Sequence, residues 1–528
     1  MQTLSELPWL TILIVVPLLA AAAIWLVPGL QRISRPVGLV VSLLVLAGFV
    51  VMATGFDLGA GMSYQFTEHA AWIPQLGVSY ALGINGLGLA MVGLSVFLVP
   101  LALLAGWREQ EIVPEGTVVA RRQAGFVALV LVLEATMIAV FAARDVFLFY
   151  VVFEAMLVPV YFLIGNYGGP KRRHAAMKFL IYSLASGLIM LVGVVAVGIL
   201  GPGGPEGYLI ENLAGSEFGL WAERWIFISF FIAFAVKAPM WPVHTWLPDA
   251  AQEASPGTSA LLVGVLDKVG TFGMLALCLP LFPEASRWAA PVIIVLAVIS
   301  VLYGAIVAVG QRDIMRLIAF TSVSHFGFIV LGIFVREEVA LTGAMLYMVA
   351  HGVSTAALFF ISGFLTQRGG TQRIGDFGGL QRVTPVLAGT WLIAGLATLS
   401  LPGLSGFVPE FLVIVGAFRV NMWAAIVAVI AVVVAALYIL LPYQRMFTGP
   451  VKENLAALPD LGGREKWVVA PLVAAMLALG IVPGPVIDVV QPVAEEAAIE
   501  QPSSLDTAAD EPDGSSDAAA AVAEGSEK

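Results

Sequence analysis

Six titratable residues lie inside long apolar segments of this 528-residue sequence. A charge at the centre of a bilayer costs about 2.5–3.5 kcal/mol on insertion scales, so it needs a partner, water or a function. The six residues are two carboxylates, two lysines and two histidines, all side chains that exchange protons: Glu154, Lys237, Lys268, His325, His351 and Glu410. Together they could form a lateral proton relay.

These residue types suit proton transfer. A lysine desolvated among helices loses affinity for its proton, and a nearby carboxylate restores that affinity. A movement of Glu154 relative to Lys237 would therefore switch the lysine between holding and releasing a proton. Histidine exchanges protons near neutral pH, so His325 and His351 can pass a proton in either direction. The structural alternative is that the lysine and the glutamate hold two helices together and that each histidine only satisfies a hydrogen bond.

Other candidate sites are weaker. Glu134 is central in its apolar segment, while Asp267 precedes Lys268 directly and so points to a different side of the helix. The single cysteine, Cys278, supports no disulfide framework and no iron–sulfur site. We find no phosphate-binding glycine loop, dinucleotide fingerprint or HExxH motif. The sequence therefore predicts no cofactor and no metal in this chain, and no nucleic-acid partner.

The composition predicts the elements that position these residues. The sequence is 59% apolar and 12% charged, whereas a soluble chain is roughly 45–50% apolar and 25% charged. Apolar runs of the length that crosses a bilayer recur along the chain, and helices satisfy their own backbone there. We predict an all-α polytopic membrane protein with about fourteen spans: 9–28, 36–56, 84–106, 124–142, 146–166, 176–200, 225–247, 257–280, 289–309, 314–335, 339–366, 384–419, 422–445 and 467–489.

The basic residues predict the orientation of these spans. Loops after odd-numbered spans carry eighteen Lys and Arg residues, and loops after even-numbered spans carry five. Cytoplasmic loops are enriched in these residues. Both termini are therefore expected on the non-cytoplasmic side of a bacterial inner membrane.

Two spans are interrupted, one by KAPMWP at 237–242 and one by SLPGLSGFVPE at 400–410. Proline removes a backbone donor, and paired broken helices indicate a transport site built on inverted repeats. Lys237 and Glu410 are 173 residues apart, and Glu154 and His325 are 171 apart. Five helices fit each interval, so the repeats would have opposite topology. The predicted units are N-terminal helices 1–3 (1–123), a first repeat (124–280), a second repeat (289–445), helix 14 (467–489) and an acidic disordered tail (495–528).

At FAVKAPMWPVHTWLPDA (234–250) the sequence resembles the antiporter-like family shared by complex I membrane-arm subunits and multisubunit cation/proton antiporters. Three further motifs carry the resemblance: LFYVVFEAMLVPVYFLIG (148–165), RDIMRLIAFTSVSHFGF (312–328) and SLPGLSGFVPEF (400–411). The resemblance implies fourteen core helices, two inverted repeats and broken seventh and twelfth helices. By motif, Glu154 corresponds to the family's fifth-helix glutamate, Lys237 to its seventh-helix lysine and Lys268 to its eighth-helix lysine. The twelfth-helix position is typically Lys in L- and N-type subunits and Glu in M-type subunits, so Glu410 favours the M type.

The chain departs from the family pattern at three positions. Ala251 stands where the family often has a loop histidine, Asn85 where an aspartate is common, and Asp267 where the neighbour of the lysine is usually apolar. The resemblance implies proton translocation driven by redox events elsewhere, with FMN, iron–sulfur clusters and quinone in partner subunits. The expected partners are L- and N-type neighbours, the lateral helix of the L-type subunit and the lipid bilayer. The rival functions are a sodium/proton antiporter subunit and a structural assembly subunit.

Overall fold

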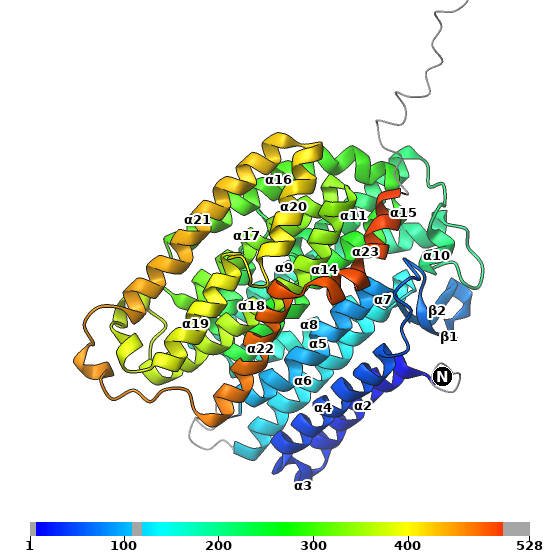
Figure 1. The fold of residues 1–528 in the computed structure, drawn as a ribbon. Helices are drawn as coiled ribbons and strands as arrows, with labels where there is room; N and C mark the ends of the chain where they lie inside the picture. The colour runs from blue at the N-terminus through cyan, green and yellow to red at the C-terminus, as the bar shows by residue number, and fades with distance from the viewer. Residues whose placement is uncertain (1–6, 108–118, 500–528) are drawn as a thin grey trace, which may run out of the picture.

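The structure, a computed structural model, describes residues 7–107 and 119–499. Helices dominate it, and the bundle runs from the N-terminal helices at one end to α21 at the other (Figure 1). Eleven of the described helical segments are long and apolar enough to cross a membrane, or twelve if one bent pair counts as a single span. The predicted class, a helical polytopic membrane protein, is confirmed.

The first part of the chain supplies helices that pack around α6. The N-terminal helices α2 and α4 both contact α6, and α4 also contacts α5. The bounds of the described helices in this part are α2 (Trp9–Leu26), α3 (Pro28–Gln31), α4 (Ser34–Ala53), α5 (Gly86–Ala105), α6 (Val119–Ala142), α7 (Val146–Ala155), α8 (Leu157–Tyr167), α9 (Arg172–Leu200) and α10 (Ile210–Leu213).

The second part of the chain contains the two predicted interruptions. The seventh predicted span, 225–247, corresponds to α11, which ends at Lys237 before a gap that reaches α12. The twelfth, 384–419, corresponds to α19 and α20, which are 14 residues each. The bounds are α11 (Leu220–Lys237), α12 (Trp246–Glu253), α13 (Pro256–Leu261), α14 (Lys268–Gly273), α15 (Leu279–Leu281), α16 (Pro283–Val309), α17 (Ile314–Val335), α18 (Glu338–Gly369), α19 (Pro385–Thr398), α20 (Phe407–Val420), α21 (Met422–Phe447), α22 (Gly463–Ile481) and α23 (Gly484–Ile499).

The two interrupted helices are packed in parallel ways. The helix α9 contacts both α11 and α12, and α18 contacts both α19 and α20. The first interruption begins at residue 238 and the second at residue 399, which is 161 residues later. Lys237 therefore precedes its interruption, whereas Glu410 follows its own. The count of fourteen spans and the inverted repeats stay predictions.

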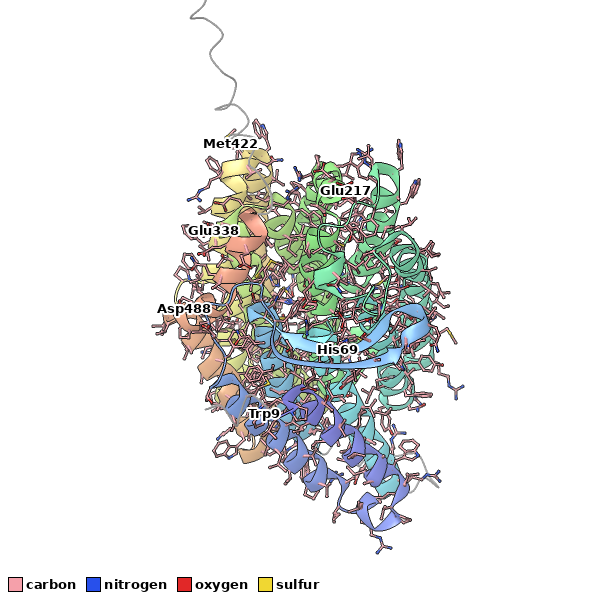
Figure 2. All side chains as sticks on the ribbon, turned by 90° about the vertical axis from the view of Figure 1, so that its right-hand side faces the viewer. Trp9, His69, Glu217, Glu338, Met422 and Asp488 are labelled. Atoms are coloured by element: carbon pink, nitrogen blue, oxygen red, sulfur yellow. The ribbon has the colours of Figure 1, made fainter. Side chains whose placement is uncertain are left out.

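A β-hairpin precedes α5, where the sequence predicted no strand. Strand β1 (Gln65–Ile73) pairs antiparallel with β2 (Val78–Ile84), and the hairpin lies across the face of the bundle seen in Figure 2. Asp145 holds the hairpin against the start of α7. One of its carboxylate oxygens accepts a hydrogen bond from the Ser79 amide of β2 at 2.8 Å, and the other caps α7 by accepting from the Leu148 amide. Burial raises the pKa of Asp145, although these backbone donors oppose the shift.

Small residues bring α16 and α17 into close contact. A Cβ added at Gly304 would lie 2.6 Å from the Ser324 amide. The hydroxyl of Ser324 donates to the Val301 carbonyl at 2.8 Å, and the hydroxyl of Ser300 donates to the Val323 carbonyl at 3.1 Å. Such contacts hold membrane helices together where lipid provides no hydrophobic driving force.

Two features of the helices were not predicted. The segment between α13 and α15 contains two π-helical turns, η3 (Leu262–Leu266) and η4 (Met274–Cys278). After α22 the chain bends by 64° into α23. The first five residues of the predicted disordered tail belong to α23, and the remainder of that prediction lies outside the described residues.

Candidate functional site

Lys268 begins α14, separated by one residue from the end of the π-helical turn η3, and its side chain is fully buried. Its ammonium nitrogen donates to the carbonyl of Val263, within that turn, at 2.7 Å. The same nitrogen lies 2.7 Å from Nδ1 of His351 on α18. It also lies 5.2 Å from the ring centroid of Phe326. The π-helical turn thus supplies an acceptor that keeps the lysine directed at the histidine.

One face of α18 carries three residues at a spacing of four: Gly343, Tyr347 and His351. Residues four apart share a helix face. A Cβ added at Gly343 would lie 2.8 Å from the amide of Val413 on α20, so this glycine permits close approach of the two helices. One turn further, the Tyr347 hydroxyl donates to Glu410 Oε2 at 2.6 Å. The next turn brings His351 to Lys268.

His325, on α17, lies beside His351 and Tyr347. Its ring centroid is 5.1 Å from that of His351 and 5.8 Å from that of Tyr347. Its Nε2 is 3.2 Å from the hydroxyl of Tyr438 on α21. A contiguous series of side chains therefore runs from α14 to α20. We call it the buried row: Lys268, His351, His325, Tyr347 and Glu410.

Glu410 ends the buried row in the first turn of α20, with 5% of its surface exposed. Its Oε2 accepts from Tyr347 and also from the hydroxyl of Ser400, which is 2.6 Å away in the interruption before α20. The N-terminus of a helix also favours negative charge. The interrupted helix thus provides a polar environment for a carboxylate inside the bundle.

Lys237 is the last residue of α11, and its ammonium lies among aromatic rings. The nitrogen is 5.1 Å from the ring centroid of Phe153 and 5.7 Å from that of Phe179. Aromatic faces attract cations. In the described part of the chain, no group accepts a hydrogen bond from this nitrogen. The charge of Lys237 therefore depends on neighbouring acids rather than on a fixed hydrogen bond.

Glu154, on α7, packs directly against α9 at Gly187. A Cβ added at Gly187 would collide with the Glu154 carboxylate, so the glycine makes room for the acid. Glu154 interacts electrostatically with Lys237. Among the residues that the structure describes, no ion pair within 4.0 Å joins the two, and Glu154 Oε1 has no hydrogen-bond partner. The predicted pair is present as neighbouring charges rather than as a locked salt bridge.

The structure thus divides the six predicted residues into two groups. Lys268, His325, His351 and Glu410 belong to the buried row, whereas Glu154 and Lys237 form a separate pair. The sequence analysis missed Tyr347, which belongs to the row, and also Tyr438 and Ser400, which contact His325 and Glu410 respectively. Tyr347 precedes His351 by one helical turn, and this spacing was the available signal. Tyr438 and Ser400 reach the row through tertiary contacts, which the sequence does not display.

The two weaker candidates are both fully buried. Neither oxygen of Glu134 and neither oxygen of Asp267 has a hydrogen-bond partner within the described residues. Asp267 interacts electrostatically with Lys268 and also with Lys237. Asp267 is therefore a neighbour both of the buried row, through Lys268, and of the Glu154–Lys237 pair, through Lys237.

A charged cluster lies at the first turn of α12 and includes side chains from α9 and α17. The carboxylate of Asp249 accepts from Lys178 at 2.6 Å and from Arg316 at 2.5 Å. Burial alone would raise the pKa of Asp249, but these two donors hold it below its usual value. Asp249 therefore stays ionised at neutral pH and joins α9, α12 and α17.

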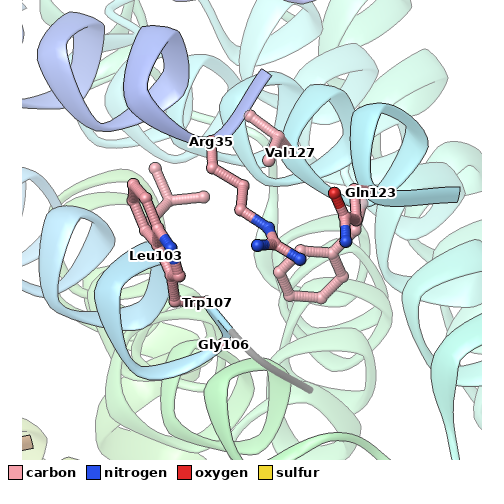
Figure 3. Close-up of a pocket in the computed structure, with 7 residues that line it drawn as sticks. Arg35, Leu103, Gly106, Trp107, Gln123 and Val127 are labelled. Carbon is pink, nitrogen blue, oxygen red and sulfur yellow. The ribbon is translucent and has the colours of Figure 1, made fainter. Parts of the chain in front are cut away.

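The described cavities do not coincide with the buried row. The cavity beside Arg35 and Trp107 has a volume of about 10 Å³, which accommodates one water molecule at most (Figure 3). A larger cavity of about 470 Å³ lies between the start of α5, the end of α23 and η4, and Glu211 and Glu496 are its acidic lining residues. No member of the buried row lines either cavity.

A polytopic helical bundle with broken helices and a buried series of titratable groups defines a class of ion-translocating membrane subunits. The profile of the family described as "NADH:quinone oxidoreductase/Mrp antiporter, TM" matches residues 143–435. The chain belongs to this family. It is 46% identical over 521 residues to NADH-quinone oxidoreductase subunit M of Mycobacterium tuberculosis (strain CDC 1551 / Oshkosh), covering 93% of this chain and 94% of that protein.

Two solved structures have the same fold. A chain of respiratory complex I from Thermus thermophilus with bound NADH superposes with a TM-score of 0.83 at 33% identity, covering 94% of this chain and 100% of that chain. A chain of the Mrp complex from Dietzia sp. DQ12-45-1b gives the same TM-score at 23% identity, covering 94% and 98%. At that identity the second likeness concerns the fold alone. Sequence similarity therefore places the chain beside the M subunits of NADH-quinone oxidoreductases.

Proposed function

We propose that the chain is the M-type, proton-translocating membrane-arm subunit of a proton-pumping NADH:quinone oxidoreductase, respiratory complex I. The observation that carries the proposal is the continuity of the buried row from Lys268 to Glu410. The 46% identity to an M subunit and the glutamate at position 410 support the same assignment. The chain performs no redox chemistry itself, and FMN, iron–sulfur clusters and quinone are bound by partner subunits.

The contact between Lys268 and His351 provides one transfer step. The ammonium donates to Nδ1, so in this arrangement the neutral imidazole carries its own proton on Nε2. When Lys268 transfers a proton to Nδ1, the ring is protonated on both nitrogens and can release a proton from Nε2. A proton thus enters on one side of the ring and leaves on the other.

The second half of the buried row delivers the proton to Glu410. His325 lies beside His351 and also beside Tyr347, whose hydroxyl already donates to Glu410. Among the described residues no hydrogen bond joins His325 to His351 or to Tyr347, and His325 Nδ1 and His351 Nε2 have no hydrogen-bond partner, so these steps need a ring rotation or an intervening water. Tyr347 completes the step by giving its proton to Glu410 and accepting another.

The Glu154–Lys237 pair provides the driving step. Redox events in partner subunits displace the charge of Glu154 relative to Lys237, and the lysine then releases its proton towards the buried row. Moving one charge across 100 mV requires about 2.3 kcal/mol. Because no ion pair within 4.0 Å locks the two side chains, Glu154 can move relative to Lys237 without breaking a direct ion pair, and their Coulomb interaction changes with the distance between them.

The same assignment implies a location and partners. The subunit lies in a bacterial inner membrane with both termini on the non-cytoplasmic side, as the distribution of basic residues favours. Its neighbours are L- and N-type subunits, and the lateral helix of the L-type subunit runs along it. Its core consists of two inverted five-helix repeats, which the parallel packing of α9 and α18 supports.

Replacement of Lys237 by alanine tests the proposal. In inverted membrane vesicles, Lys237→Ala should abolish NADH-driven acidification while the amount of assembled complex persists. Lys452→Ala, in an exposed loop, is the matched control and should pump normally. Acidification at normal NADH turnover in Lys237→Ala would refute the proposal. Sodium-dependent proton movement without NADH would instead favour the antiporter alternative.

A further inference from the structure

The fully buried carboxylate of Asp267 lies between the two groups of candidate residues without belonging to either. It has no exposed surface, and neither oxygen has a hydrogen-bond partner in the described chain. A buried carboxylate without donors is costly unless it is protonated or beside a positive charge. Its charge state should therefore follow that of its neighbours.

Asp267 lies on the face of its helix that is directed at α11. Gly270, three residues later, packs against the end of α11: a Cβ there would lie 2.5 Å from the Phe234 carbonyl and 2.6 Å from the Ala238 amide. Residues three apart share a helix face. Asp267 therefore faces the end of α11, where Lys237 is the last helical residue.

The adjacent Lys268 faces the opposite neighbour, α18. Its ammonium contacts His351, and Gly264, four residues earlier, packs near Gly352 of the same helix, with a Cβ there 3.3 Å from the Gly352 carbonyl. The segment that carries both residues is thus in contact with α11 and with α18. Asp267 interacts electrostatically with the ammonium groups of both Lys237 and Lys268.

We propose that Asp267 carries protons across the gap between Lys237 and the buried row. No hydrogen bond joins Asp267 to either lysine within the described residues, so each transfer needs a side-chain rotation or an intervening water. In the first transfer an N–H bond of the Lys237 ammonium breaks and an O–H bond forms on Asp267. In the second transfer that O–H bond breaks and an N–H bond forms on Lys268. The carboxylate is ionised again after the second transfer, so no other reactant is needed. This inference rests on the proposed function and assigns one further proton carrier to it.

The isosteric variant Asp267→Asn tests the inference, because an amide cannot carry the proton. In inverted membrane vesicles, initial acidification per assembled complex should fall about tenfold or more, and Asp267→Glu should restore most of it. Thr271→Val is the matched control, since this equally buried hydroxyl bonds, among the described residues, only to the Lys268 carbonyl of its own helix. If Asp267→Asn prevents assembly, Asp267→Leu replaces it, because that variant buries no polar group.

The outcomes separate this inference from the proposed function when Lys237→Ala is measured alongside. Wild-type acidification in Asp267→Asn together with loss in Lys237→Ala overturns the role of Asp267 alone. Wild-type acidification in Lys237→Ala overturns the proposed function. A fall in the amount of complex with unchanged acidification per complex, in both Asn and Glu variants, assigns Asp267 a purely structural role and also overturns the inference.

Discussion

Removal of the Tyr347 hydroxyl should impair proton transfer at the end of the buried row. Glu410 has two hydrogen-bond donors, Tyr347 and Ser400, each 2.6 Å from the same carboxylate oxygen. A hydrogen bond to a charged group contributes about 1.5–3 kcal/mol. Because 1.4 kcal/mol corresponds to about tenfold, Tyr347→Phe should reduce the population of ionised Glu410 by about 10- to 100-fold relative to its protonated form.

The assay is NADH-driven acidification of inverted membrane vesicles, divided by the amount of assembled complex. We expect Tyr347→Phe to pump at about one tenth of the wild-type rate or less, because ionised Glu410 is the acceptor of the row. Tyr443→Phe is the control, since Tyr443 packs against Trp391 and Phe447, and no hydrogen bond joins it to Glu410 within the described residues. Equal pumping by the two phenylalanine variants would refute the reasoning.

Two further predictions concern the scaffold. Gly270→Ala should destabilise the protein by about 1–3 kcal/mol and lower the amount of assembled complex, because the added Cβ meets backbone atoms of α11. The control is Gly389→Ala, whose added Cβ meets nothing within 4 Å and which should assemble normally. Equal assembly of the two variants would contradict this packing. Arg368→Met should cost about 1.5–3 kcal/mol, since it removes the nearest cation from the buried carboxylate of Glu465, which keeps only the Gly462 amide at 2.8 Å and Arg464 at 3.8 Å among the described residues. Arg419→Met removes a pair whose arginine is 58% exposed and should cost under about 1 kcal/mol. The temperature at which each complex loses activity measures this difference in stability. Similar temperatures for the two arginine variants would contradict the prediction that the buried pair contributes more than the exposed one.

The sequence predicted the membrane class and most of the spans because each apolar run carries its own signal. The run at 146–166 corresponds to α7 and α8, and 422–445 lies within α21. The interruptions were also predictable, since proline and glycine act locally on the backbone. The β-hairpin before α5 was missed because almost all of it falls between the predicted spans 36–56 and 84–106, and strand pairing is a contact between segments that a search for apolar runs does not detect.

The candidate site was predicted by residue type and completed only by tertiary structure. A buried charge is visible in a sequence because apolar neighbours surround it, as for Lys268. A tyrosine or serine in the same setting is unremarkable by type, so the roles of Tyr347 and Ser400 emerge only from their contacts with Glu410. Asp267 illustrates both limits: its adjacency to Lys268 predicts a different helix face, and only the packing of Gly270 against α11 supports the inference that this face is directed at α11.

The most direct test of the central claim compares wild type with Glu154→Gln in inverted membrane vesicles. NADH oxidation, NADH-driven acidification and the amount of assembled complex are recorded together. If Glu154 controls the proton on Lys237, assembly should persist while acidification and NADH oxidation collapse together. If acidification and oxidation both survive at wild-type rates, the pair only holds helices together, and the claim that these buried charges drive proton translocation is wrong.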